Sequence, residues 1–184
     1  MVSRYTRYLD HIMKYNIPPK PWTNLYTEAL FQDPLELASL CYWIDQMGVV
    51  TYLEIGVAGG GLMHFFNNCM QLVPFGIDTA QPVMVEPDWV YIGSSHDEST
   101  LEWAEGEGPF DMIFIDADHS YEAVKKDWQM YNHLAKKMVV FHDIAHKTLP
   151  GPKRVFDEIK GDKLKIIRPE ASGTGIVFIE QRNK

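Results

Sequence analysis

Short apolar segments alternate along the chain with longer amphipathic ones. The apolar runs have the length and continuity of buried strands, and they cover residues 50–56, 74–78, 89–95, 110–116, 138–143, 164–169 and 174–180. Between most of them, apolar residues recur with helical spacing, at 33–47, 60–71, 97–106, 120–137 and 151–161. This alternation predicts an α/β fold with three layers, in which helices cover both faces of a mostly parallel sheet.

The C-terminal end of the predicted sheet differs from the rest. Its last two strands are separated by too few residues for the crossover that joins parallel neighbours, so we expect them to form an antiparallel hairpin. The sheet then has seven strands. No repeat or linker divides the 184 residues, so residues 1–184 are predicted to form a single domain, with residues 1–30 as an N-terminal arm or lid. Asp33 and Asp97 are expected to cap the helices that follow them.

Composition limits the range of partners. The chain has 17 basic and 25 acidic residues and a formal net charge of −8, which disfavours nucleic acid and anionic membranes as partners and favours a small molecule. No apolar run approaches the ~18 residues that a membrane span requires. Cys41 and Cys69 have no metal-binding spacing and are interpreted as small core residues, which is typical of a cytoplasmic protein.

A glycine-rich loop follows the first predicted strand in the sequence LEIGVAGGG, residues 53–61. Ligands of open α/β sheets bind outside the carboxyl ends of the strands, where this loop lies. Gly56 lets the chain turn sharply out of the strand, and Gly60 lets the backbone approach a ligand closely. A glycine pattern alone is weak evidence for any one ligand.

Two acids near this loop narrow the choice of ligand. Glu54 lies at the end of a buried strand, where its charge is costly unless a group such as an ammonium pairs with it. Asp78 ends the second strand, where a carboxylate can accept hydrogen bonds from both ribose hydroxyls. Together they indicate a ligand with a ribose and a cationic amino-acid portion. The alternative is that both acids are helix caps or loop residues.

Five titratable residues follow the fourth and fifth predicted strands: Asp116, Asp118, His119, His142 and Asp143. They should meet at the same edge of the sheet as the glycine loop. Such a group can bind a divalent cation that acidifies a bound hydroxyl. An imidazole with an ordinary pKa near 6.5 can also accept a hydroxyl proton at neutral pH. A purely structural role, with Asp118 as a helix cap, stays open.

The ordered set LEIGVAGGG, FGID and FDMIFIDADHSYEAVKKDW resembles the class I methyltransferases that use S-adenosylmethionine. The similarity covers roughly residues 30–180 and is greatest to small O-methyltransferases of the catechol, macrocin-methyltransferase and cephalosporin-hydroxylase types. It implies a Rossmann-like fold. It also implies that Glu54, Gly56 and Gly60 hold the methionine portion, that Asp78 holds the ribose, and that Ser95 and His96 contact the adenine.

The resemblance further implies a metal site at Asp116, His142 and Asp143 and a general base at His119. Asp116 is assigned to the catalytic and cofactor-binding sets as well. Catechol-type enzymes carry an acid and an amide where this chain has His142 and Asp143. A histidine ligand favours a transition metal such as Mn²⁺ over Mg²⁺, or indicates that no metal binds.

The sequence therefore predicts an enzyme that transfers a methyl group from S-adenosylmethionine to an oxygen of a small molecule. A hydroxylase-like reaction on the same fold and a non-catalytic protein that binds the cofactor are the alternatives. The acceptor and the oligomeric state stay open, with a homodimer among the options.

Overall fold

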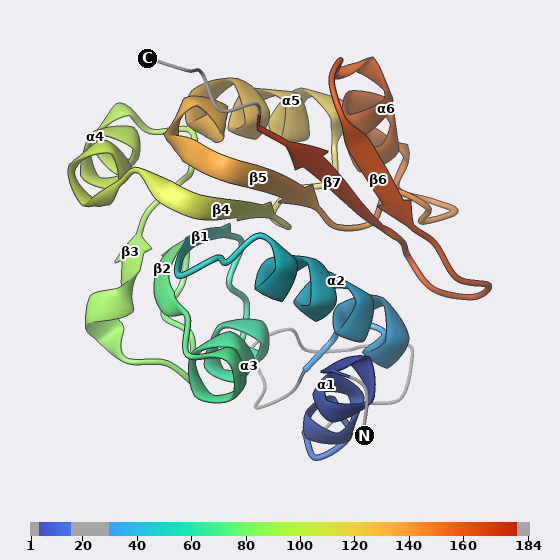
Figure 1. Cartoon of the computed structure of the whole chain (residues 1–184). Coiled ribbons are helices and arrows are strands. Elements are labelled where there is room, and N and C mark those ends of the chain that lie inside the picture. The colour runs from blue at the N-terminus through green and yellow to red at the C-terminus, as the bar shows by residue number, and fades with distance from the viewer. Residues whose placement is uncertain (1–3, 16–29, 180–184) are drawn as a thin grey trace.

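The computed structural model describes residues 4–15 and 30–179, and its elements form three layers (Figure 1). The central sheet has seven strands in the order β3-β2-β1-β4-β5-β7-β6. The strands are β1 (Thr51–Ile55), β2 (Val73–Asp78), β3 (Val90–Ile92), β4 (Phe110–Ile115), β5 (Ala135–Phe141), β6 (Lys163–Ile166) and β7 (Thr174–Phe178). One face is covered by α1 (Arg4–Ile12), α2 (Pro34–Gln46) and α3 (Gly61–Met70), and the other by α4 (Glu98–Glu107), α5 (Tyr121–Tyr131) and α6 (Pro150–Glu158).

Strand direction follows the prediction. β7 runs antiparallel to both of its neighbours, β5 and β6, whereas the pairs among β1 to β5 are parallel. The hairpin strand β7 therefore inserts between β5 and β6. The predicted α/β sandwich with a C-terminal antiparallel hairpin is confirmed.

Alternate residues of the central strands build two separate cores. On β1, Tyr52 joins the core under α2 and α3, while Leu53 and Ile55 join the core under α5 and α6. The same alternation on β4 and β5 makes each strand apolar on both faces, which is why these strands read as continuous apolar runs. Cys41 lies in the first core and Cys69 packs against it, so their interpretation as core residues is confirmed.

Element boundaries differ from the prediction in one instructive place. Residues 135–137 were predicted to end a helix, but they begin β5, after a short 3₁₀ turn at Asn132–Leu134. Lys136 forms an ion pair with Asp111, and Lys137 donates a hydrogen bond to the Gly48 carbonyl. These contacts and pairing with β4 override the local helical preference of the two lysines.

The two predicted helix caps have different outcomes. Asp33 accepts hydrogen bonds from the backbone N–H groups of Leu35 and Glu36, as expected for the cap of α2. Asp97 occupies the predicted N-cap position of α4, but its side chain accepts no capping hydrogen bond. Its backbone carbonyl accepts the bonds instead, from the N–H groups of Thr100 and Leu101.

The predicted N-terminal arm is only partly described. α1 packs on α2, and Ile12 at its end is fully buried. Residues 1–3 and 16–29 lie outside the described residues, so the prediction of a lid is not tested. Among the described residues, no helix combines the length and apolarity needed to cross a bilayer.

Candidate functional site

Two cavities at the carboxyl ends of the parallel strands share one wall. The larger has a volume of about 590 Å³ and extends from Glu54 and the glycine loop to His119, His142 and Asp143. The smaller has a volume of about 370 Å³ and includes Asp78, Ser95 and His96. Gly56, Ala58, Asp116 and Ala117 line both cavities. A single elongated ligand can therefore pass from one cavity to the other over the glycine loop.

The glycine loop lies very close to the end of β4. Gly56 has φ +92°, and a Cβ there would lie 2.4 Å from the backbone oxygen of Asp116. No other residue fits this position without moving the chain. Gly60 has φ +87° and begins α3, but it does not line either cavity. Gly60 thus shapes the loop, and its predicted contact with a cofactor stays a prediction.

Asp78 holds the same loop through hydrogen bonds to its backbone. Its Oδ2 accepts hydrogen bonds from the backbone N–H groups of Val57 at 2.9 Å and Ala58 at 2.8 Å, and its Oδ1 accepts one from Ala80 at 3.0 Å. The predicted ribose contact of Asp78 stays a prediction. These hydrogen bonds also give Asp78 a second role that the sequence did not indicate.

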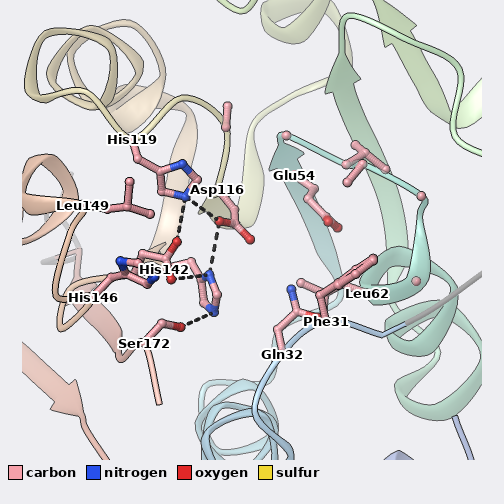
Figure 2. A pocket seen from close by; sticks show the side chains of 17 residues that line it. Phe31, Gln32, Glu54, Leu62, Asp116, His119, His142, His146, Leu149 and Ser172 are labelled. Carbon is pink, nitrogen blue, oxygen red and sulfur yellow. Dashed lines mark hydrogen bonds and ion pairs between the residues drawn. The ribbon is translucent and has the colours of Figure 1, made fainter. Parts of the chain in front are cut away.

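Glu54 is buried and lines the larger cavity together with the acid and imidazole groups (Figure 2). Its Oε2 accepts a hydrogen bond of 3.0 Å from the Tyr52 hydroxyl. Burial raises the pKa of Glu54 well above its ordinary value of 4.5, and the nearby charges of Asp116 and Asp78 raise it further, against the lowering effect of the Tyr52 bond. A cationic ligand group would relieve this cost of ionising Glu54.

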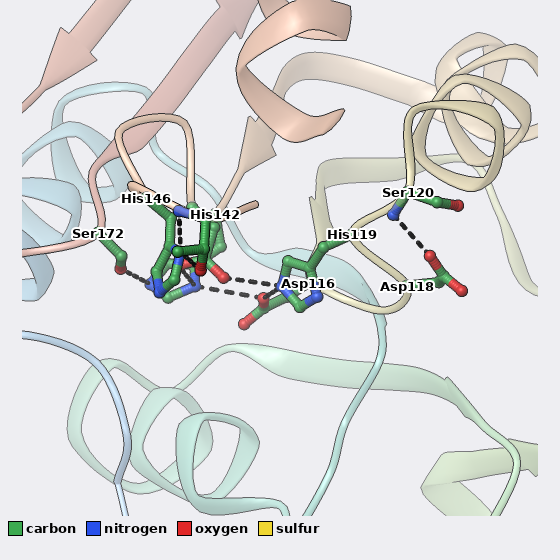
Figure 3. A network of polar contacts seen from close by, with 9 residues as sticks. Asp116, Asp118, His119, Ser120, His142, His146 and Ser172 are labelled. Carbon is green, nitrogen blue, oxygen red and sulfur yellow. Dashed lines mark hydrogen bonds and ion pairs between the residues drawn. The ribbon is translucent and has the colours of Figure 1, made fainter. Parts of the chain in front are cut away.

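Four of the five predicted titratable residues form one cluster (Figure 3). Asp116 Oδ1 lies 3.2 Å from His142 Nδ1 and 3.5 Å from His119 Nε2. Asp143 contacts the same two rings, with Oδ2 at 2.7 Å from His119 Nε2 and Oδ1 at 3.3 Å from His142 Nδ1. The fifth residue, Asp118, instead accepts a hydrogen bond from the Ser120 N–H. Ser120, not Asp118, is the N-cap of α5, so the cap alternative for Asp118 is wrong.

The cluster balances its own charge. Contact with Asp116, and then with Asp143, raises the pKa of His119 to about 10, against the effect of burial. Burial lowers the pKa of His142, but the charges of Asp116 and Asp143 outweigh it and raise that pKa to about 9. Burial raises the pKa of Asp143, but the two imidazoles hold it at about 2. At neutral pH both imidazoles are therefore protonated in the ligand-free protein.

This charge state corrects the reasoning that led to His119. The prediction used an ordinary histidine pKa near 6.5, whereas His119 has a pKa of about 10 and is protonated at neutral pH in the ligand-free protein. His119 can act as a base only if a bound cationic group first neutralises Asp116 and Asp143, so that His119 can lose its proton. The role itself stays a prediction.

Backbone strain marks both walls of the larger cavity. Asp143 has φ +61° and Ala58 has φ +52°, in the left-handed region that residues other than glycine seldom adopt. Such conformations cost on the order of 1–3 kcal/mol and gather at functional sites. Asp143, one of these two residues, also contacts His119 through its carboxylate.

Three of the cluster residues suit a divalent cation. Asp116, His142 and Asp143 each offer one ligand atom, and these atoms all lie within 4.8 Å of one another. Two carboxylates and one imidazole are a donor set that divalent transition metals and Mg²⁺ both accept. Ser172 Oγ lies 3.4 Å from His142 Nε2 on the far side of the ring and helps to orient it.

Ser95 and His96 line the smaller cavity, as the predicted adenine contact requires. The Ser95 hydroxyl donates a hydrogen bond of 2.7 Å to Asp127, and His96 Nε2 lies 3.1 Å from the same oxygen. Ser95 does not cap α4, because Asp97 occupies the N-cap position.

Several lining residues were not among the predicted site residues. Phe31, Gln32, His146, Leu149 and Ser172 line the larger cavity, and Asp127 lines the smaller one. Most of them come from loops whose sequence carries no periodic signal. The sequence did carry a signal for Asp127. Helical spacing places this acid on the same face of α5 as Ala123, Val124 and Tyr131, which are buried.

Comparison with known proteins adds the family. A family model described as a methyltransferase domain matches residues 53–144, which include the glycine loop, Glu54, Asp78 and the acid and imidazole cluster. The chain belongs to this methyltransferase family. A search of curated proteins gives no match for this methyltransferase.

Solved structures share the fold of this methyltransferase at low identity. MycE from the mycinamycin biosynthetic pathway, in complex with Mg and SAH, has 16% identity and a TM-score of 0.61, over 84% of this chain and 50% of MycE. An O-methyltransferase from Bacillus cereus in complex with SAH has 17% identity and a TM-score of 0.59, over 98% of this chain and 92% of the other. TomG from Streptomyces achromogenes, an O-methyltransferase of tomaymycin synthesis in complex with SAM, has 14% identity and a TM-score of 0.54, over 96% and 89% of the two chains. This chain thus spans about half the length of MycE, with 50% covered.

Proposed function

We propose that this protein transfers the methyl group of S-adenosylmethionine to a hydroxyl oxygen of a small molecule. One observation carries the proposal. Two cavities meet at Gly56 and Asp116, with acids suited to the cofactor on one side and the acid and imidazole cluster on the other. The similar structures support it, because they include O-methyltransferases with bound SAH or SAM.

The cofactor would lie across the shared wall. Glu54 pairs with its ammonium group and Asp78 accepts hydrogen bonds from its ribose, while Gly56 leaves room for the chain of the ligand. The adenine enters the smaller cavity beside Ser95 and His96. Asp116 and His119, which line the larger cavity, would border the methyl group that is transferred.

Methyl transfer needs an oxygen nucleophile held in line with the bond between sulfur and the methyl carbon. His119 accepts the hydroxyl proton as the oxygen attacks the methyl carbon, and the electrons of the breaking bond remain on sulfur as a neutral thioether. His119 and His142 hold protons at neutral pH in the ligand-free protein. His119 must therefore lose its proton before this step, and His142 must lose its own before it can act as a ligand.

Asp116, His142 and Asp143 would hold a divalent cation, Mg²⁺ or Mn²⁺. The cation would supply acidification and orientation of the acceptor hydroxyl. MycE, with Mg in its structure, supports this part of the proposal. The larger cavity also has apolar walls at Phe31, Leu62 and Leu149, which suit a small organic acceptor.

The hydroxylase-like and binding-only alternatives are not favoured, because the family match is to a methyltransferase domain. A cytoplasmic location stays our expectation, supported by the two free cysteines. The experiment is a screen of small hydroxylated acceptors with methyl-labelled S-adenosylmethionine, with and without Mn²⁺ or Mg²⁺. Label transfer by the wild type and slower transfer by His119→Ala are expected. Transfer of label to nitrogen or carbon instead of oxygen would contradict the proposal.

A further inference from the structure

Asp127 is a buried acid that the proposed chemistry does not use. It lies on α5, is 1% exposed, and lines the smaller cavity. The other buried residues of α5 are Ala123, Val124 and Tyr131. An acid in such a position costs folding free energy unless its oxygens have donors.

Only one of the two Asp127 oxygens has donors among the residues that the structure describes. Oδ1 accepts a hydrogen bond of 2.7 Å from the Ser95 hydroxyl and lies 3.1 Å from His96 Nε2. Oδ2 is buried and has no hydrogen-bond partner within the described part of the chain. Buried polar groups of this kind are uncommon in native proteins and call for an explanation. A ligand that donates a hydrogen bond would provide one.

Two further hydrogen bonds join α5 to the loop that contains Ser95 and His96. The Tyr131 hydroxyl donates a hydrogen bond of 2.7 Å to the Ser95 carbonyl, and Lys126 donates one of 3.3 Å to the His96 carbonyl. Lys126, Asp127 and Tyr131 therefore hold Ser95 and His96 in place. The wall of the smaller cavity is built before a ligand arrives, which lowers the ordering cost of binding.

The position of the ribose decides which part of the ligand reaches this wall. With the ribose at Asp78 and the ammonium group at Glu54, the base occupies the smaller cavity, which Asp78 and Asp127 both line. The edge of adenine carries a single donor group, the exocyclic amine. Asp127, whose Oδ2 lacks a partner among the described residues, and the only donor of the base thus belong to the same cavity.

We propose that Asp127 accepts a hydrogen bond from the exocyclic amine of adenine and makes the site select 6-aminopurine over 6-oxopurine ligands. The inference rests on the proposed function, because it needs an adenosyl ligand in the smaller cavity. In a 6-oxopurine a carbonyl oxygen replaces the amine and faces the carboxylate. A site built around a ligand N–H rejects the analogue that lacks it, because its own polar group is then left without a partner.

The test compares S-adenosylhomocysteine with S-inosylhomocysteine by titration calorimetry, in the wild type and in Asp127→Asn. The wild type should bind the adenosyl ligand about 10- to 150-fold more tightly, the range for a hydrogen bond to a charged group. The asparagine amide can donate to the 6-oxo group, so the variant should lower this ratio to about threefold or less. Asp111→Asn is the matched control. Asp111 is also a buried acid, but it lies at the start of β4, away from the two cavities, and accepts a hydrogen bond from the Val50 N–H. Asp111→Asn should keep the wild-type ratio.

The outcomes separate the inference from the proposed function. A wild type that binds neither ligand would overturn both. A wild type that binds both ligands equally, or an Asp127→Asn variant that weakens both by the same factor, would overturn the inference alone. If Asp127→Asn does not fold, Ser95→Ala replaces it, because loss of the hydroxyl frees the carboxylate to rotate. That variant should lower the ratio severalfold, and an unchanged ratio would count against the inference.

Discussion

Replacement of Glu54 by glutamine changes the charge beside the larger cavity and little else. The amide keeps the shape of the side chain, and its oxygen can still accept the hydrogen bond from Tyr52. In the wild type, burial raises the pKa of Glu54 well above 4.5, so part of the ligand-free protein carries a protonated Glu54. An ammonium group that binds beside Glu54 favours the ionised form. Cofactor binding should therefore release a proton from the wild type and none from this position in Glu54→Gln.

The magnitude follows from two opposing terms. A hydrogen bond between charged groups contributes about 1.5–3 kcal/mol, or roughly 10- to 150-fold in affinity. Removing the proton costs about 1.4 kcal/mol for each unit by which the pKa of Glu54 exceeds the pH. Wild-type affinity should thus rise with pH between 4.5 and the raised pKa of Glu54. The affinity lost in Glu54→Gln should therefore be smallest at low pH and grow as the pH rises toward the raised pKa of Glu54.

The assay is calorimetry with S-adenosylhomocysteine at several pH values, each in two buffers of different ionisation enthalpy, so that proton release is counted directly. Stability without ligand supplies an independent reading. Folded Glu54 has a raised pKa and binds more protons than unfolded Glu54, so wild-type stability falls as pH rises above 4.5, and the glutamine variant lacks this loss. Equal affinity, equal pH dependence and equal proton release in both proteins would refute the reasoning.

Three further substitutions test the other parts of the site. Asp143→Asn should lower Mn²⁺ affinity in calorimetry and slow methyl transfer, because one of the three metal ligands is weakened. S-adenosylhomocysteine binding should stay intact. Unchanged Mn²⁺ binding would exclude Asp143 as a ligand. His119→Ala should slow turnover at neutral pH and retain Mn²⁺ binding, because a base acts only on the acceptor proton; loss of the metal together with activity would instead make His119 a ligand. Asp78→Ala should weaken S-adenosylhomocysteine binding by roughly 1–3 kcal/mol, partly by releasing the loop at Val57 and Ala58, and an unchanged titration would rule out the ribose contact.

The sequence predicts the fold well, because both signals used are strong in a parallel α/β protein. Strands buried on both faces give continuous apolar runs, and a short link between the last two strands requires an antiparallel pair. It also predicts the site in outline, because strand ends in such a sheet meet at one edge. Asp116 and His142 follow different strands, yet their side chains lie 3.2 Å apart.

Other features depend on contacts between distant segments and left no trace in the local pattern. β5 begins at Ala135 and not at residue 138, because Lys136 and Lys137 have partners on Asp111 and Gly48. The pKa of His119 depends on two acids brought together by folding. The loops that supply Gln32 and Ser172 to the larger cavity have no periodicity that identifies them.

The most direct test of the whole account is a crystal structure of the protein with S-adenosylhomocysteine. We expect the adenosine in the smaller cavity, with its ribose hydroxyls on Asp78, and the homocysteine in the larger cavity, with its ammonium group on Glu54 and its sulfur facing Asp116 and His119. A ligand bound in the reverse direction, or bound away from the wall at Gly56 and Asp116, would contradict the proposed methyl transfer at this site.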